Sequence, residues 1–397
     1  MNLSKKGEKI NASMTLALSA KANQMKADGH DVVSFGAGEP DFNTPKHISE
    51  AGKEAIDKGF TKYTAAAGTV DLKKAIQKKF KEDNDLDYDL DQIIVSNGAK
   101  HSLFNTFQTI LNPGDEVIIA RPFWVSYPET VKLGDGVPVF VDAKEENGFK
   151  MKIEDLKKAI TDKTKAIILN SPNNPTGCLY TKDELQEIAD LAVENEIFVV
   201  SDEIYEELVY DDGEHISIAS LGDEIKELTI VINGMSKAYA MTGWRIGFAA
   251  GPKKIVNIMS NIQSHATSNP NSIAQYASTV GLNSSKEVTK EMLKAFEERR
   301  NYMVEKVNSI ENMSCRKPEG AFYVMINLED IIGKSYNGKD IDGSMTFAEI
   351  LLEEAKVAVI PGKAFGSDKF IRLSYATSLN DIKKGLNRLE EFVNELK

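Results

Sequence analysis

Residues 229–237 read TIVINGMSK, an apolar run that ends directly in glycine, serine and lysine. Thr229–Asn233 lacks the alternation of apolar and polar residues, which is typical of a strand buried on both faces of a parallel sheet. A lysine just past such a strand is unusual, because most lysines lie on open surface. We therefore expect a central strand of an α/β sheet here, with Lys237 at its carboxyl end.

Further apolar runs without alternation lie on both sides of this stretch in the sequence. Helical segments such as 102–111 and 182–195 separate several of them. This spacing predicts one large, doubly wound, mostly parallel sheet of seven strands. The expected strands are Ile93–Ser96, Glu116–Ala120, Val137–Asp142, Lys165–Asn170, Phe198–Ser201, Thr229–Asn233 and Arg245–Ala250.

The pattern of helical and apolar segments changes after about residue 280. A charged amphipathic helix is expected over 286–310, and it is followed by Phe322–Asn327, a helix near 345–355, Val357–Ile360, Phe370–Ser374 and a last helix over 380–396. The length of 397 residues also favours more than one core, since single cores stop growing at about 250–300 residues. We expect an α/β chain in three parts: an amino-terminal arm with helix 16–27 that joins the small domain (1–45), a large domain (46–280) and a smaller α+β domain (281–397).

Charge and composition exclude several classes of protein. The net charge of −12, from 60 acidic and 48 basic residues, disfavours nucleic acid as a partner. We find no apolar run of about 18 residues and no signal peptide, so we expect no membrane partner. Cys178 and Cys315 form no metal-binding or disulfide motif, which fits a reducing cytoplasm.

Ligands of open parallel sheets bind outside the carboxyl ends of the strands, so the residues that follow each run are the candidates for a site. The run 93–96 leads into Asn97-Gly98-Ala99-Lys100 and then a helix, which is a pattern for binding phosphate at a helix N-terminus. A plain strand–helix turn is the alternative. The run 165–170 leads into SPNNPTG, a rigid turn whose Asn173 and Asn174 could hold a polar ligand atom.

The run 198–201 leads into Asp202 and Tyr205, and Arg245 begins the last run. A carboxylate leaving a buried strand needs a partner, unless it only caps the next helix. A half-buried arginine usually pairs with an anion, and the forked N–H donors of its guanidinium group match the oxygens of a phosphate. Pyridoxal 5′-phosphate (PLP) needs this set: a phosphate cup, cations, a carboxylate for the ring nitrogen, donors for the ring oxygen and a lysine for the aldehyde.

The sequence resembles the class I aminotransferases of PLP fold type I over nearly its whole length, and it is most similar to the prokaryotic aspartate aminotransferase branch. The resemblance rests on Gly36–Phe42, Tyr63 before Gly68, Pro122–Pro128, Ser171–Gly177, Ser201–Tyr205, Ser236–Gly247 and Phe370–Ser374. The large domain is then the PLP-binding domain. The resemblance implies a homodimer with shared active sites, acting on amino acids and 2-oxo acids.

The resemblance also implies a role for each matching residue. Lys237 would bind the aldehyde and move the proton, Asp202 would pair with the ring nitrogen, and Asn174 and Tyr205 would hold the ring oxygen. Trp124 would stack on the ring. The phosphate would be held by Gly98, the backbone of Ala99 and Lys100, Ser236 and Arg245, with Tyr63 arriving from the other subunit.

The substrate residues follow in the same way. Arg372 would clamp the α-carboxylate against Gly38. Another branch of the family uses an arginine of the partner subunit for the side-chain carboxylate, but 263–272 contains no arginine. The branch resembled here uses a lysine and two small hydroxyl residues, and Lys100, Ser13 and Thr15 match that pattern. Helix capping by Ser13 and Thr15, and a phosphate contact by Lys100, are the alternatives.

We therefore expect an aminotransferase that converts L-aspartate and 2-oxoglutarate to oxaloacetate and L-glutamate, without a metal. Aromatic amino acids, alanine or other amino donors are the alternative within the fold. A Rossmann dehydrogenase is disfavoured, because Gly38 is followed three residues later by Asp41 rather than glycine. A regulator built on the fold would need an added DNA-binding domain, for which the chain has no room.

Overall fold

The computed structural model describes residues 3–8, 10–11 and 14–397. A seven-stranded sheet has the order β2-β8-β7-β6-β5-β3-β4, and only β8 runs antiparallel to its neighbours. The predicted α/β class and seven-stranded, mostly parallel sheet are confirmed. The strands are β2 (Ile93–Ser96), β3 (Glu116–Arg121), β4 (Val137–Asp142), β5 (Thr164–Asn170), β6 (Phe198–Asp202), β7 (Thr229–Gly234) and β8 (Gly247–Ala250).

The prediction that the last strand begins at Arg245 is wrong. Arg245 has a φ of +58°, in the left-handed region, so the extended backbone starts only at Gly247. A Cβ on Gly247 would lie 2.2 Å from the backbone nitrogen of Ala99, so no larger residue fits there. This close approach brings the strand against the start of the helix that follows β2.

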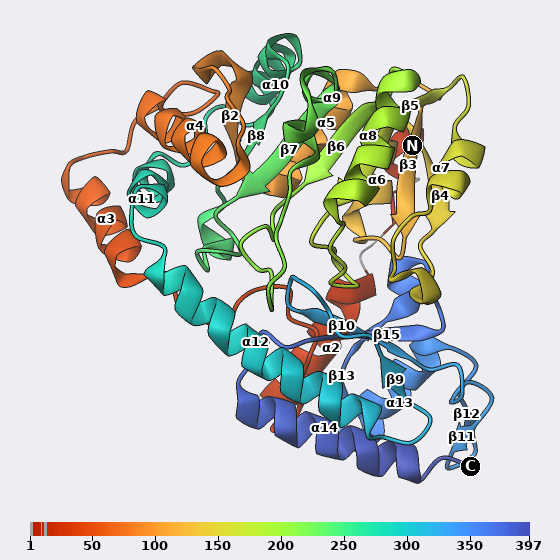
Figure 1. Ribbon diagram of the computed structural model, residues 1–397. Helices are drawn as coiled ribbons and strands as arrows, with labels where there is room; N and C mark the ends of the chain where they lie inside the picture. Colours follow the sequence, from red (N-terminus) through yellow and green to blue (C-terminus); the bar gives the residue numbers. More distant parts are fainter. Residues whose placement is uncertain (1–2, 9, 12–13) are drawn as a thin grey trace.

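Helices cover both faces of the large sheet (Figure 1). Neighbouring strand residues face opposite layers: Val117 and Ile119 pack under α5 (Ala99–Ile110), whereas Ile118 packs under α8 (Lys182–Glu194). The first layer also contains α6 (Ser126–Leu133) and α10 (Lys253–Ala266). The second layer is completed by α3 (Lys46–Asp57), α4 (Val70–Asn84), α7 (Ile153–Ala159), α9 (Asp223–Leu228) and α11 (Ser272–Leu282).

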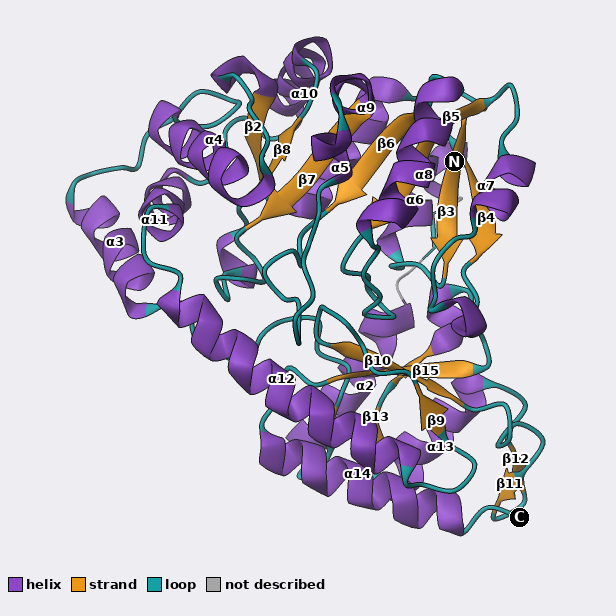
Figure 2. Ribbon diagram, in the orientation of Figure 1, coloured by secondary structure: helices purple, strands orange, loops and turns teal. Residues whose placement is uncertain are grey.

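A second, antiparallel sheet has the order β14-β15-β10-β9. In Figure 2 the arrowheads of β3, β4 and β7 point toward this second sheet. Its strands are β9 (Ser314–Cys315), β10 (Tyr323–Asn327), β14 (Ile360–Pro361) and β15 (Phe370–Ser374), and its helices are α13 (Ser344–Ala355) and α14 (Leu379–Asn394). The short strands β11 (Ser335–Tyr336) and β12 (Lys339–Asp340) form a hairpin.

The amino-terminal segment packs beside the second sheet. Strand β1 (Val33–Ser34) pairs in parallel with β13 (Val357–Ala358), and Ala22 of α2 (Met14–Ala27) packs with Leu352. The predicted single run 357–360 is therefore wrong, because it divides into β13 and β14, which belong to different sheets. The short α1 (Lys5–Glu8) instead contacts the turn between α6 and β4, through an ion pair of 2.7 Å between Lys6 and Asp135.

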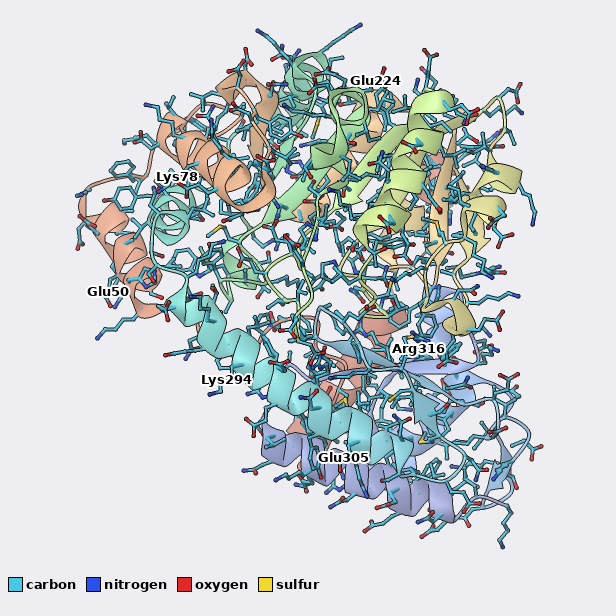
Figure 3. The ribbon with its side chains drawn as sticks, viewed as in Figure 1. Glu50, Lys78, Glu224, Lys294, Glu305 and Arg316 are labelled. Atoms are coloured by element: carbon cyan, nitrogen blue, oxygen red, sulfur yellow. The ribbon has the colours of Figure 1, made fainter. Side chains whose placement is uncertain are left out.

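The long helix α12 (Glu287–Asn308) runs from beside the helices of the large sheet to α14 beside the second sheet (Figure 1). Its buried residues recur with helical period: Met292, Phe296, Arg300, Met303 and Val307. The exposed side chains of Lys294 and Glu305 are labelled in Figure 3. Among the described residues, no helix combines the length and the apolar character that crossing a membrane requires.

Candidate active site

A cavity of about 880 Å³ opens at the carboxyl ends of the parallel strands, between the two sheets. Residues from both sheets and from the amino-terminal segment form its walls. Eleven residues that the sequence nominated line it together: Gly38, Ala99, Lys100, Trp124, Asn174, Asp202, Tyr205, Ser236, Lys237, Arg245 and Arg372.

Lys237 follows β7 and lies inside this cavity. Its Nζ donates a hydrogen bond to the carbonyl oxygen of Gly38 and lies 5.8 Å from the ring centroid of Tyr205. Burial lowers the pKa of Lys237 to about 8, although the carboxylate of Glu39 opposes this shift. An amine with such a pKa is partly neutral near physiological pH and can act as a nucleophile or a base.

Asp202 ends β6 and is 3% exposed. Its Oδ2 accepts a hydrogen bond of 2.6 Å from the hydroxyl of Tyr127, and its Oδ1 accepts one of 3.3 Å from the backbone nitrogen of Ile204. Burial raises the pKa of Asp202 to about 6, and the Tyr127 hydrogen bond opposes the rise. The group is therefore a carboxylate that a cationic ligand atom would stabilise strongly.

The rigid loop after β5 places one asparagine in the cavity. Asn170 fixes this loop, because its Nδ2 donates to the carbonyl oxygen of Asp202 at 2.8 Å and its Oδ1 accepts from the backbone nitrogen of Asn174 at 2.9 Å. Asn173 does not line the cavity, since its Oδ1 accepts hydrogen bonds from Thr176 instead. Of the two asparagines in the loop, Asn174 alone lines the cavity.

Arg372 reaches the cavity from the central region of β15 and is 4% exposed. Its Nη1 donates to Oδ1 of Asn174 at 3.0 Å, and its Nη2 donates to the carbonyl oxygen of Gly36 at 3.3 Å. The guanidinium lies 4.2 Å from the ring centroid of Tyr323. Its buried Nε has no hydrogen-bond partner among the described residues, which leaves a donor for an anion.

The start of α5 forms a cationic corner of the cavity. Gly98 caps the helix with a φ of +88°, and a Cβ there would lie 2.2 Å from Nη2 of Arg245. Arg245 is held by the carbonyl oxygens of Thr242 at 2.9 Å and Asn97 at 3.2 Å. The free backbone N–H groups of a helix N-terminus and an adjacent guanidinium suit a phosphate.

Lys100 and Trp124 form the neighbouring wall. The Nζ of Lys100 lies 4.9 Å from the Trp124 ring centroid. Burial and the charge of Arg245 lower the pKa of Lys100. An anion bound beside Lys100, in addition to a phosphate at the helix N-terminus, would relieve the repulsion between Lys100 and Arg245.

Gly98, which caps α5, and Asn173 are not among the cavity walls, and three further nominated residues are not placed in the cavity either. Tyr63 is 90% exposed and is absent from the cavity walls of its own chain. Ser13 lies outside the described residues. Thr15 belongs to α2, but the description does not extend to its side chain.

Sequence reasoning missed several residues of the walls. Tyr127 lies three residues after Trp124 in a segment already singled out, and Asn170 ends a predicted strand, so both had a signal in the sequence. Glu39 and Thr242 also lie in segments already singled out, but nothing in the sequence indicated their hydrogen bond of 2.7 Å, which joins segments about 200 residues apart. Tyr323, whose hydroxyl lies 3.0 Å from that of Tyr205, is contributed by the second sheet.

Residues 30–389 match the family model of the class I and II aminotransferases. The chain belongs to this family. It is 51% identical to the aspartate aminotransferase of Bacillus subtilis strain 168, with both chains fully covered. It is 44% identical to a probable aspartate/prephenate aminotransferase of Aquifex aeolicus, over 98% of this chain and 97% of that one.

Solved structures agree with this assignment. The aspartate aminotransferase of Rhizobium meliloti superposes with a TM-score of 0.97 at 42% identity, covering all of both chains. The enzyme of Thermus thermophilus solved with maleate gives a TM-score of 0.93 at 42% identity, covering 99% of this chain and 100% of that one. The resemblance inferred from the sequence is confirmed, and the protein is an enzyme that transfers amino groups.

Proposed function

We propose that this aminotransferase binds PLP at Lys237. The observation that carries the proposal is the presence, in one cavity, of a lysine with a lowered pKa, a buried carboxylate and a cationic helix N-terminus. These three groups match the aldehyde, the ring nitrogen and the phosphate of PLP. When bound, PLP supplies an electron sink that stabilises negative charge at the substrate α-carbon.

Each residue has a defined task in this proposal. Lys237 would hold the aldehyde and could carry the α-proton, Asp202 would keep the ring nitrogen protonated, and Tyr127 orients Asp202. Asn174 and Tyr205 donate to the ring oxygen, while Trp124 covers the ring. Gly98, the backbone of Ala99 and Lys100, Ser236 and Arg245 hold the phosphate, which leaves the Lys100 side chain for the substrate.

We propose aspartate and 2-oxoglutarate as the preferred substrate pair. Both are dicarboxylates, so two anion anchors are needed. Arg372 supplies one through its unpaired Nε and its fork, with Gly38 beside the α-carboxylate. Lys100 supplies the second in the wall of the same cavity, with Ser13 and Thr15 as further donors. The T. thermophilus relative solved with maleate, itself a dicarboxylate, supports this choice.

We further propose a cytoplasmic homodimer in which Tyr63 enters the partner's site. Four large apolar side chains, Ile56, Phe60, Tyr63 and Val70, are exposed along 56–70, as expected for a surface that another subunit covers. A twofold dimer is also the commonest closed assembly. Two buried free cysteines agree with a reducing compartment. We also propose that the chain divides into an amino-terminal arm (1–45), a large domain (46–280) and a small domain (281–397).

Absorbance and substrate preference test the proposed function together. The purified protein should absorb above the protein band after incubation with PLP, and borohydride should bleach that absorbance. A panel of amino donors should then rank aspartate and glutamate above alanine and phenylalanine. Absence of the cofactor band contradicts the PLP assignment, whereas a preference for aromatic or neutral donors contradicts only the substrate assignment.

A further inference from the structure

A buried charged cluster lies behind the turn that carries Asp202 and Tyr205. Asp202 and Tyr205 line the cavity, but Glu203 and Glu206 on the same turn do not. These two carboxylates instead contact His215 and Lys79. The proposed reaction uses neither of these contacts.

Glu203 is the centre of this cluster and is 1% exposed. Its Oε1 accepts hydrogen bonds from the hydroxyls of Ser201 at 2.8 Å and Ser217 at 2.7 Å. Its Oε2 lies 3.2 Å from Nε2 of His215, whose side chain is 7% exposed. The backbone nitrogen of Glu203 donates to the carbonyl oxygen of Ile232 on β7 at 2.9 Å. The carboxylate is therefore fixed in position next to Asp202.

Glu206 is paired with Lys79 of α4, and both side chains are 7% exposed. The Nδ2 of Asn84 donates to the other carboxylate oxygen of Glu206 at 2.8 Å. One atom each of Glu203, Glu206 and His215 lies within 4.8 Å of the others. Because Lys79 already neutralises Glu206, protein cations can balance this cluster without a metal ion.

The protonation of His215 decides the net charge of the cluster. Two carboxylates and one ammonium leave one net negative charge when His215 is neutral, and none when it is protonated. Burial lowers the pKa of His215, but the hydrogen bond and charge of Glu203 raise it above its ordinary value overall. Burial raises the pKa of the Tyr88 phenol, and the charges of Glu203 and Glu227 raise it further.

The charge of Glu203 also acts on the cavity. Burial is the main cause that raises the pKa of Asp202, and the neighbouring Glu203 carboxylate raises it further. An unbalanced Glu203 therefore disfavours the ionised form of Asp202, which the ring nitrogen of PLP requires. A cation on His215 removes that penalty.

We propose that His215 is a positioning residue, which as a cation paired with Glu203 cancels the charge behind Asp202 and so keeps Asp202 ionised for the cofactor. This inference rests on the proposed function, since a cationic ring nitrogen is the ligand that needs this carboxylate. His215 acts through Glu203 and does not line the cavity.

Four apoproteins test the proposal: wild type, His215→Gln, Glu203→Gln and the double variant. The dissociation constant of PLP is measured at equilibrium, and the melting temperature of each apoprotein is recorded without cofactor. His215→Gln leaves one net charge. At about pH 5, below the Asp202 pKa, we expect PLP to bind the variant about ten-fold more weakly than wild type, as for a rise of about one unit in that pKa. The exposed His47→Gln variant is the matched control and should bind PLP like wild type.

The other two variants separate charge from structure. Glu203→Gln and the double variant both lack the unbalanced carboxylate, so we expect PLP affinity within about three-fold of wild type. A double variant that binds as weakly as His215→Gln overturns the proposal, as does a His215→Gln variant with unchanged affinity. If His215→Gln fails to fold, the Glu203→Gln variant tests the proposal instead. Weaker PLP binding by Glu203→Gln than by wild type contradicts the proposal that His215 acts by cancelling the charge of Glu203. A wild type that does not bind PLP contradicts the proposed function itself.

Discussion

The hydroxyl of Tyr127 donates a hydrogen bond of 2.6 Å to Oδ2 of Asp202, and both residues are buried. This bond opposes the rise in the Asp202 pKa that burial causes. A hydrogen bond to a charged group contributes about 1.5–3 kcal/mol, so Tyr127→Phe should weaken PLP binding roughly ten- to hundred-fold. Equilibrium titration of the apoprotein with PLP measures this effect.

Tyr88→Phe is the matched control for that substitution. The Tyr88 hydroxyl is also buried, but it has no hydrogen-bond partner in the described part of the chain. Its removal should therefore leave PLP affinity within about two-fold of wild type, as expected where no bond is lost. Equal losses in the two variants would show that the Tyr127 bond has no special role.

The second prediction concerns Lys237, which alone among the cavity lysines follows the central strand β7. Lys237→Ala should reduce transamination by at least about 1,000-fold, because both the covalent anchor and the proton carrier are lost. Peptide mapping after borohydride should find the pyridoxyl label on Lys237 in the wild type. The control is Lys26→Met at the exposed edge of the same cavity, and a label on any other lysine contradicts the assignment.

The third prediction concerns the pH dependence of stability. The pKa of Asp202 is about 6 in the folded apoprotein against 3.8 for the free group, so the folded state holds more protons between these pH values. Its contribution to the free energy of unfolding therefore falls as the pH rises from about 4 to about 6.

Asp202→Asn should remove this penalty. The apo variant should be more stable than apo wild type by about 1–3 kcal/mol at pH 7, and the two should converge near pH 4. Urea unfolding at the two pH values measures the difference. A variant that is equally or less stable at pH 7 contradicts the raised pKa. Adding PLP should stabilise the wild type more than the variant.

The fourth prediction concerns donor choice. Lys100→Ala should lower kcat/KM for aspartate roughly ten- to hundred-fold, because a buried substrate carboxylate loses a charged hydrogen bond. The values for alanine and phenylalanine should change much less. Parallel kinetics with the three donors measure the ratio. An equal fall for all donors would mean that Lys100 contacts only the cofactor.

The fifth prediction concerns the exposed Tyr63. If it completes the partner's site, mixing Tyr63→Phe subunits with Lys237→Ala subunits creates one fully wild-type site in each mixed dimer. Random pairing gives about a quarter of wild-type activity at limiting PLP, more than the average of the two variants alone. Sedimentation should show a dimer under the same conditions. No gain on mixing, or an active monomer, rejects the shared site.

The sequence was sufficient for the large sheet, because its strands other than the edge strand β4 are largely buried and read as continuous apolar runs. β2 and β4 begin and end where the predicted runs do, and so does β15 of the second sheet. The sequence was misleading at Arg245, because nothing in the local composition indicates that this residue has a positive φ and that the strand starts only at Gly247. Likewise, the composition of 357–360 carries no sign that Val359 separates strands of two sheets.

The cavity residues that were predicted are those next to strand ends, where topology alone brings side chains together. Tyr127 was missed as a partner of Asp202 because the contact depends on how α6 packs under the sheet. The Glu203 cluster was missed for a similar reason. Lys79 and His215 lie on segments before and after the turn, and no local pattern joins them.

The cavity takes its walls from positions as distant as Asn23 and Thr377. A ribosome makes the chain from the amino end, so all seven strands of the large sheet emerge before Arg372 has been added. A nascent chain at that point holds Lys237 and Asp202 but has no clamp for a substrate carboxylate. Completion of the catalytic pocket is therefore one of the last events in the biosynthesis of this enzyme.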